Sequence, residues 1–160
     1  RLGAYLNGLG AGIHTTAPYE SDTHTFYFNL AERLLKTQGI IQQQIYSIKA
    51  ERYSTQKELF RRVETGRDIM EENYASPLAI ECLAAASAMS PFHFSRTFKQ
   101  VYHLSPYQFI IQKRLQKGKD LLKSNRYSVS EVAYLVGFAT VQSFSKAFKN
   151  AFQVSPGAYK

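Results

Sequence analysis

Cysteine and long hydrophobic runs are scarce in this sequence, and each shortage excludes a class of protein. Of the 160 residues, one is cysteine, five are proline and none is tryptophan. A single cysteine, Cys82, excludes an internal disulfide framework and a zinc site built on cysteines, and is typical of a reducing compartment. No apolar run approaches the ~20 residues that a membrane span needs, and no signal-peptide pattern is present.

The patterns that carry catalytic or metal chemistry are also missing. Four histidines are scattered without the spacing of metal ligands: His14, His24, His93 and His103. The sequence has no Gly-rich phosphate-binding loop and no G-x-S-x-G nucleophile elbow. We therefore expect no enzyme activity, no metal and no cofactor. Cys82 falls inside a predicted helix and is interpreted as a core residue rather than a redox switch.

The positive charge is concentrated in the second half of the sequence. The chain carries 20 basic and 12 acidic residues, a formal net charge of +8. Residues 77–160 contain eleven of the bases and three of the acids, whereas residues 1–76 contain nine of each. A basic half beside a neutral half is typical of a surface that faces a polyanion such as nucleic acid, with solubility alone as the alternative.

Helix signals begin at Thr25, and no stretch alternates with the period of a strand, so we expect an all-α protein. Residues 1–25 are rich in Gly, Ser and Thr and are predicted to form a loop. Two short helices, with the narrow apolar stripes typical of a packing or dimer seam, are expected on either side of Gly39. A capping box at Thr55–Glu58 predicts the start of a third helix. Ser–Pro pairs, a second capping box and Gly137 predict further helices over residues 78–88, 91–102, 106–123, 128–136, 140–152 and from 156 onward.

The sequence repeats itself at a spacing of about 50 residues. Residues 94–109, FSRTFKQVYHLSPYQF, align with residues 144–159, FSKAFKNAFQVSPGAY. Two phenylalanines recur four residues apart in both copies, and in a helix that spacing places them on one face. The other face then carries short, polar or basic residues. Each copy therefore has the layout of a helix-turn-helix whose second helix enters a DNA major groove, with two ordinary αα-hairpins as the alternative.

These residues resemble the DNA-binding domain of the AraC/XylS family. LAAASAMSPFHFSRTFK and VAYLVGFATVQSFSKAFK resemble its two helix-turn-helix signatures, SPYQFIIQKRLQKGKDLL its connecting helix and SPGAYK its terminal motif. The resemblance implies a first unit over about 54–105, a long connector helix over about 106–123 and a second unit over about 124–160. Residues 1–53 lack an equally specific motif and are interpreted as a helical linker left from an upstream effector or dimerisation domain.

The resemblance also implies a function, a cytoplasmic bacterial transcription regulator that we expect to be an activator. Its two recognition helices would enter adjacent major-groove segments about 10 bp apart on one DNA face. The expected partners are double-stranded DNA, RNA polymerase and, through residues 26–52, a second copy of the chain. The alternative is a helical dimerisation or signalling module whose DNA binding is mainly non-specific.

Individual roles follow from the same resemblance. Base-facing positions are Phe92, Ser95 and Arg96 in the first unit and Val141, Gln142, Ser145 and Lys146 in the second. Phosphates are expected to meet the helix N-termini and two lysines: Ser90, Thr140, Lys99 and Lys149.

Three of these side chains have a specific expected target, each with an alternative. Arg96 would bind guanine or else a phosphate, Gln142 would bind adenine or else only water, and Phe92 would contact a thymine methyl group or else pack back onto the domain. The connector lysines are interpreted as a solvated face: Lys113, Lys117 and Lys123. Two positions depart from the family pattern, because Ala88 stands in the first turn where glycine is usual and Gly118 stands in the connector where alanine is usual. We expect a slightly altered turn at Ala88 and a softer connector at Gly118.

Overall fold

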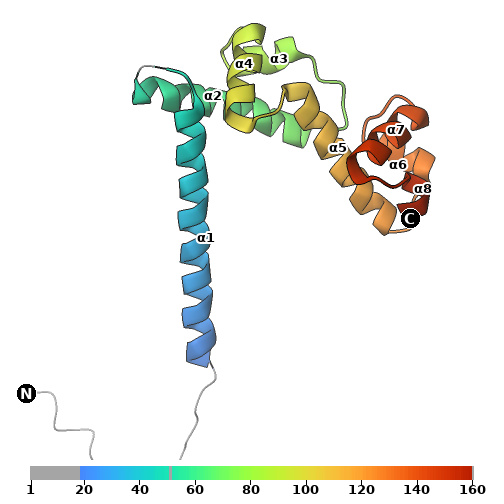
Figure 1. The fold of residues 1–160 in the computed structure, drawn as a ribbon, viewed down its shortest axis with the longest axis horizontal. Helices are drawn as coiled ribbons and strands as arrows, with labels where there is room; N and C mark the ends of the chain where they lie inside the picture. Colours follow the sequence, from blue (N-terminus) through green and yellow to red (C-terminus); the bar gives the residue numbers. More distant parts are fainter. Residues whose placement is uncertain (1–18, 51, 160) are drawn as a thin grey trace, which may run out of the picture. The chain divides into compact units, whose positions relative to one another are not determined.

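The structure, a computed structural model, describes residues 19–50 and 52–159, and every regular element among them is an α-helix (Figure 1). The helices are α1 Tyr19–Ser47, α2 Tyr53–Glu72, α3 Ile80–Ala86, α4 Pro91–Tyr102, α5 Pro106–Lys123, α6 Val129–Leu135, α7 Val141–Phe152 and α8 Pro156–Tyr159. The expected all-α fold is confirmed, with the helix pairs α3–α4 and α6–α7 on either side of the connector α5.

α1 differs from two expectations. The loop predicted for residues 1–25 is wrong from Tyr19 onward, where α1 begins, and residues 1–18 lie outside the described part of the chain. The two helices expected around Gly39 are one continuous helix. A single glycine costs a helix interior only about 1 kcal/mol relative to alanine. Since α1 contains no proline and many good helix formers, the helix continues through the glycine.

The capping box predicted at Thr55–Glu58 is wrong. α2 begins three residues earlier than predicted, with Arg52 in place of Thr55 at the N-cap and no side-chain cap bond. The carboxylate of Glu58 instead accepts hydrogen bonds from Arg61 and Arg62, at N–O distances of 3.1 and 2.9 Å. The hydrogen bond from Arg61, and to a smaller extent that from Arg62, lowers the pKa of Glu58 to about 2. A carboxylate held by two arginines within its own helix is not available to the backbone one turn earlier.

The helix starts predicted after Pro77 are largely confirmed. In four helices the N-cap side chain accepts a hydrogen bond from the backbone N–H three residues on: Ser90, Ser105, Ser128 and Thr140. The predicted box from Ser128 to Glu131 is closed in both directions. Each such cap stabilises its helix by about 1 kcal/mol. The helix predicted over 78–88 is shorter than expected, since α3 has seven residues.

Two hydrophobic cores lie within the compact unit Ile41–Lys160. The first joins α2, α3 and α4, and the second joins α5, α6, α7 and α8. Each core is built on a fully buried phenylalanine pair, Phe94 and Phe98 in α4 or Phe144 and Phe148 in α7. The internal repeat of the sequence is therefore a repeat of cores.

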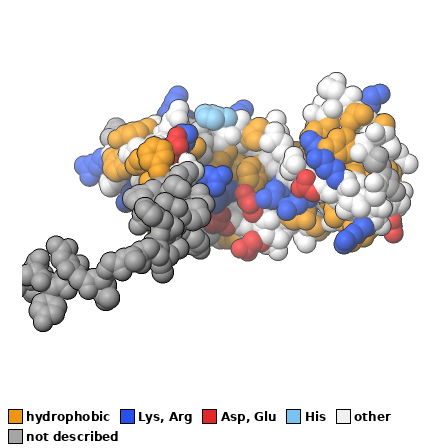
Figure 2. Space-filling model, turned by 90° about the horizontal axis from the view of Figure 1, so that it is seen from below, with side chains coloured by type: hydrophobic (Ala, Val, Ile, Leu, Met, Phe, Trp, Pro, Cys, Tyr) orange, Lys and Arg blue, Asp and Glu red, His pale blue; other side chains and the backbone are white. Residues whose placement is uncertain are grey.

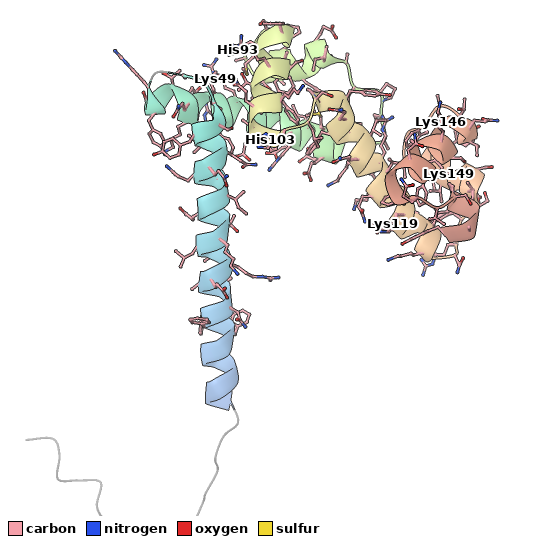
Figure 3. All side chains as sticks on the ribbon, viewed as in Figure 1. Lys49, His93, His103, Lys119, Lys146 and Lys149 are labelled. Atoms are coloured by element: carbon pink, nitrogen blue, oxygen red, sulfur yellow. The ribbon has the colours of Figure 1, made fainter. Side chains whose placement is uncertain are left out.

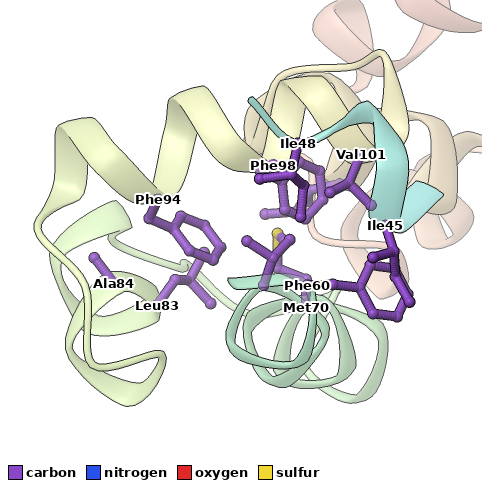
Figure 4. Packing of buried hydrophobic residues seen from close by; sticks show 11 residues of the cluster. Ile45, Ile48, Phe60, Met70, Leu83, Ala84, Phe94, Phe98 and Val101 are labelled. Atoms are coloured by element: carbon purple, nitrogen blue, oxygen red, sulfur yellow. The ribbon is translucent and has the colours of Figure 1, made fainter. Parts of the chain in front are cut away.

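The last turn of α1 belongs to the first core. Ile45 and Ile48 are buried among the side chains of Phe60, Phe98 and Val101 (Figure 4). The Ser47 hydroxyl donates a hydrogen bond to the backbone carbonyl of Gln100, with an O–O distance of 2.9 Å. The end of α1 thus contacts α4, the helix that we expect to read DNA.

Gly66 in α2 and Gly118 in α5 allow a phenylalanine ring to contact the helix backbone. A Cβ at Gly118 would lie 2.9 Å from Cε2 of Phe144, and a Cβ at Gly66 would overlap the ring of Phe94. Both positions are buried. Gly118, which departs from the family pattern, therefore has a packing reason in this chain.

Cys82 is exposed, so its expected place in the core is wrong. The buried residues of α3 are Leu83 and Ala84, and Ser87 continues their face just after the helix. Successive helical residues are about 100° apart. Cys82 therefore falls on the side of this short helix that faces away from the core.

The turns of the two helix-turn-helix units have the same backbone conformation. Ala88 has φ 50° and its counterpart Gly137 has φ 87°, both in the left-handed region. In each turn the next N–H returns to the carbonyl of the small helix residue, Met89 to Ala84 and Phe138 to Ala133, both at 2.9 Å. The first unit therefore adopts the glycine conformation with an alanine, which is strained by about 1 kcal/mol.

We expect Ala88→Gly to raise the free energy of unfolding by about 0.5–1 kcal/mol, because relief of the left-handed strain exceeds the extra chain entropy of glycine in the unfolded state. Urea unfolding followed by circular dichroism measures the change. The control is Ala85→Gly, inside α3, which should lower stability by about 0.5–1 kcal/mol. A lower urea midpoint for Ala88→Gly would contradict the strain.

Candidate nucleic-acid interface

The first recognition helix, α4, presents an outward face opposite its buried phenylalanines. Phe92 is 76% exposed, Arg96 and Lys99 are exposed, and Ser95 is half-buried. The exposure of Phe92 is contrary to the alternative in which its ring packs back onto the domain. An aromatic ring without a protein partner at this point is available to a ligand.

The second recognition helix, α7, presents a similar face with basic residues at the same two positions. Gln142, Lys146 and Lys149 are exposed and Ser145 is half-buried. Lys146 and Lys149 both project from α7 in Figure 3. Val141 is half-buried and packs against the second core, so part of its side chain is already occupied by the protein.

The N-termini of the two recognition helices offer different numbers of backbone donors. In α4 the first position is proline, which has no N–H, and the third N–H is used by the Ser90 cap at 3.3 Å. This leaves the N–H of Phe92. In α7 the Thr140 cap uses only the N–H of Ser143, at 3.1 Å, and leaves those of Val141 and Gln142. The N-terminus of α7 therefore has one more backbone N–H left for an anionic ligand than that of α4.

Two hollows border the first recognition helix. Arg96 lines one of about 180 Å³ together with Lys49 and His93, and Figure 3 shows these last two close to each other at one end of the unit. Ser95 lines the other, an apolar hollow of about 280 Å³ that Pro106 and Tyr107 also line. Lys49 was not expected at this surface, because it lies in the linker and only the packing of α1 on α4 brings it there.

The connector lysines have structural partners or face solvent. The ammonium of Lys113 lies 2.8 Å from Oε2 of Glu71 in α2. Lys119 lies over the rings of Phe152 and Tyr159, 4.8 and 5.5 Å from their centroids. Lys117 and Lys123 are exposed. On the face of the molecule in Figure 2, acidic and basic side chains are interspersed rather than gathered into one patch.

Arg114 was not among the predicted site residues, and the structure gives it a definite role. Its guanidinium donates hydrogen bonds to three backbone carbonyls: those of Tyr74, Ser76 and Gly137. Burial lowers the pKa of the guanidinium from its usual value, although an arginine remains charged in a protein. Its place in the connector motif SPYQFIIQKRLQKGKDLL was the signal for it in the sequence.

Within the described residues, no group of His, Cys, Asp and Glu side chains is arranged to hold a metal ion. None of the helices there has both the length and the apolar character that crossing a membrane requires.

Comparison with known proteins assigns the domain. Residues 83–160 match a family model described as a helix-turn-helix domain. The chain is 47% identical over 81 residues to the HTH-type transcriptional regulator MtrA of Neisseria gonorrhoeae, a match that covers 51% of this chain and 27% of that protein. The chain thus spans about a quarter of the length of such curated relatives.

Two solved structures are similar over the same region. One is the DNA-binding domain of AdpA, a global transcriptional factor, in complex with a target DNA, with 30% identity, a TM-score of 0.58 and coverage of 61% of this chain and 88% of that one. The other is a probable AraC family transcriptional regulator from Rhodopseudomonas palustris, with 25% identity, a TM-score of 0.58 and coverage of 62% and 94%. The chain therefore belongs to the AraC family of helix-turn-helix transcriptional regulators.

Proposed function

We propose that this chain binds a two-part site in duplex DNA and regulates transcription in the bacterial cytoplasm. The observation that carries the proposal is the pair of matched outward faces on α4 and α7, each opposite a buried phenylalanine pair. Each face is rich in short, polar and basic side chains, as a helix that enters a major groove requires. The DNA complex of the similar AdpA domain supports the same use of these helices.

Within each half of the site, we assign base contacts and phosphate contacts to different residues. Arg96 would bind guanine and Gln142 adenine, since an exposed guanidinium and an exposed amide can each form two hydrogen bonds to these bases. The exposed ring of Phe92 would contact a thymine methyl group. Ser95, Ser145, Lys146 and, less directly, Val141 would complete the base-facing set. The helix ends at Ser90 and Thr140, with Lys99 and Lys149, would contact phosphates.

Selection from random duplex DNA tests the function directly. We expect two distinct motifs to be enriched, with centres about 10 bp apart, because one recognition helix would read each motif. Enrichment is measured by sequencing the bound pool. A single enriched motif would mean that one unit contacts only phosphates. No enrichment would mean that the chain binds DNA without sequence specificity.

The division between base and phosphate contacts predicts two kinds of variant. Arg96→Ala should cost about 1–3 kcal/mol of binding free energy and relax the choice of base at one position. Lys149→Ala should weaken binding to all sequences. It should also reduce the slope of log affinity against log salt concentration by about 1, the value for one lost phosphate contact. Fluorescence anisotropy on the selected site and its single-base variants, at several salt concentrations, measures both.

Lys123→Ala is the matched control, because Lys123 is exposed in the last turn of α5 and belongs to neither recognition helix, so its loss should change neither quantity appreciably. An equal loss for every sequence in Arg96→Ala would show that Arg96 binds a phosphate and not a base.

We further propose that the chain is an activator that acts with RNA polymerase. Activation is the outcome expected from the family resemblance, and repression by occlusion is the competing outcome. Transcription in vitro from a promoter that carries the selected site, with purified RNA polymerase, distinguishes the two by the sign of the change in transcript.

The second candidate function is dimerisation through residues 26–52, and a specific face of α1 favours it. Tyr27, Leu30 and Leu34 are 62%, 42% and 58% exposed, and their 3–4 spacing is that of a coiled-coil seam. The ion pair of Glu32 with Lys36, with an N–O distance of 2.8 Å, lies off this stripe. A second copy of the helix would bury the stripe, and this linker could then pass a signal from an upstream domain to the DNA-binding unit.

We expect the chain to sediment as a dimer at micromolar concentration and Leu34→Glu to sediment as a monomer, because a charge in the seam would be buried without a partner. Analytical ultracentrifugation measures the mass. Asn29→Glu, next to the stripe but outside it, should remain dimeric. A monomeric mass for the unmodified chain at all concentrations would contradict a seam within these residues.

A further inference from the structure

Arg114 lies at the junction between the two helix-turn-helix units. Its Nε is 2.6 Å from the carbonyl oxygen of Tyr74, and its Nη2 is 3.0 Å from that of Ser76. Its Nη1 is 2.6 Å from the carbonyl oxygen of Gly137. The first two carbonyls lie in the segment between α2 and α3, and the third lies in the turn between α6 and α7. One side chain of the connector therefore binds both units.

Three carbonyls in these directions suit a guanidinium and not an ammonium. A guanidinium is a rigid planar fork with five N–H donors, so it can reach acceptors on different sides at once. A lysine ammonium places its donors on a single nitrogen and would leave at least one of the carbonyls without its partner. Hydrogen bonds from a charged donor are also roughly twice as strong as those between neutral groups.

The backbones of the two units also meet directly at this junction. Any Cβ at Gly137 would overlap the carbonyl of Ala75, which lies in the chain between Tyr74 and Ser76, two of the three residues whose carbonyls Arg114 binds. The counterpart of Gly137 in the first unit is Ala88, which is exposed. Only the turn of the second unit faces the other unit so closely, which explains why the same backbone conformation is built with glycine there and with alanine in the first unit.

The connector α5 contributes side chains to both cores, from a different segment in each case. Ile110 packs into the first core, whereas Leu115 and Leu122 pack into the second. Ile111 also packs against the second core, so α5 passes from one core to the other at Ile110–Ile111, and Arg114 lies three residues beyond this change. A change of side-chain contacts at this point can alter the angle between the units without opening either core.

We propose that Arg114 is a positioning residue that fixes the separation and rotation of α4 relative to α7, and thereby the number of base pairs between the two halves of the DNA site. This inference rests on the proposed two-part DNA binding. Each added base pair moves the second half-site by about 3.4 Å and turns it by about 36° around the DNA axis, since one turn of about 10 bp spans about 34 Å. A protein with a rigid junction should bind a site with one added base pair less tightly, whereas a protein with a loose junction should bind both spacings with similar affinity.

The test uses the full chain and a set of duplexes in which the two selected half-sites are separated by the preferred spacing or by one or two base pairs more or fewer. Arg114→Met, which retains the length of the side chain, should lower affinity for the preferred spacing about tenfold through lost preorganisation. Its preference for that spacing over the one-base-pair variants should fall to about twofold or less. Affinity for a duplex with one isolated half-site should stay unchanged.

Lys117→Met is the matched control, because it removes one exposed positive charge from the same helix without touching the junction. It should retain the spacing preference of the unmodified chain. If Arg114→Met fails to fold, Arg114→Lys provides the same comparison, since lysine keeps the charge and can satisfy only part of the carbonyl set.

A measurement without DNA separates this inference from the proposed function. Spin labels at Lys99→Cys and Lys149→Cys, in a Cys82→Ser background, report the distance between α4 and α7. We expect a narrow distance distribution in the chain that retains Arg114 and a broad one when Arg114→Met is added. An unchanged distribution, an unchanged spacing preference or an equal loss of affinity for all duplexes including the isolated half-site would overturn the positioning role. A narrow distribution that broadens in the variant, in a chain that shows no two-part preference on DNA, would support the junction and contradict the proposed function.

Discussion

Burial of two phenylalanines one helical turn apart, in α4 and again in α7, determines which side of each recognition helix is free. Phe94, Phe98, Phe144 and Phe148 are fully buried. Truncation of a buried phenylalanine to alanine typically costs about 3–5 kcal/mol, whereas an N-cap contributes about 1 kcal/mol. The caps therefore define where these helices begin, but the phenylalanine pairs set their rotation. Once that rotation is set, the outward positions of α4 and α7 follow without any further choice.

The phenylalanine pairs in turn require small residues opposite them. The ring of Phe94 lies against Gly66, and the ring of Phe144 lies against Gly118. In a sequence, a glycine inside a helix signals a cost, and nothing local indicates that a ring from another helix occupies the space of its missing side chain. The cost of about 1 kcal/mol per glycine is outweighed by burial of the aromatic ring, which is worth about 1.5–3 kcal/mol.

The elements that the sequence predicted well are those specified by local chemistry. Serine and threonine caps, first-position prolines and the repeat of the phenylalanine spacing placed α4, α5, α6 and α7 nearly to the residue. The errors arose where long-range packing or helix continuity decides the outcome. α1 is helical at Tyr19, where a loop was expected, and continues through Gly39, where a break was expected. Glu58 forms ion pairs with two arginines instead of closing a capping box. Cys82 lies on the outer side of a helix that is too short to show a clear period.

The candidate site was predictable in its exposed face and not in its asymmetry. The repeat predicts two equivalent units, yet Pro91 at the first position of α4 is exposed, whereas Val141 at the first position of α7 packs partly into the second core. The first unit alone is supported by the end of α1, through Ile48 and the bond from Ser47 to the backbone of α4. A duplicated sequence thus gives two helices with one geometry and different neighbours. Of the two recognition helices, α4 is therefore the one that contacts the end of α1.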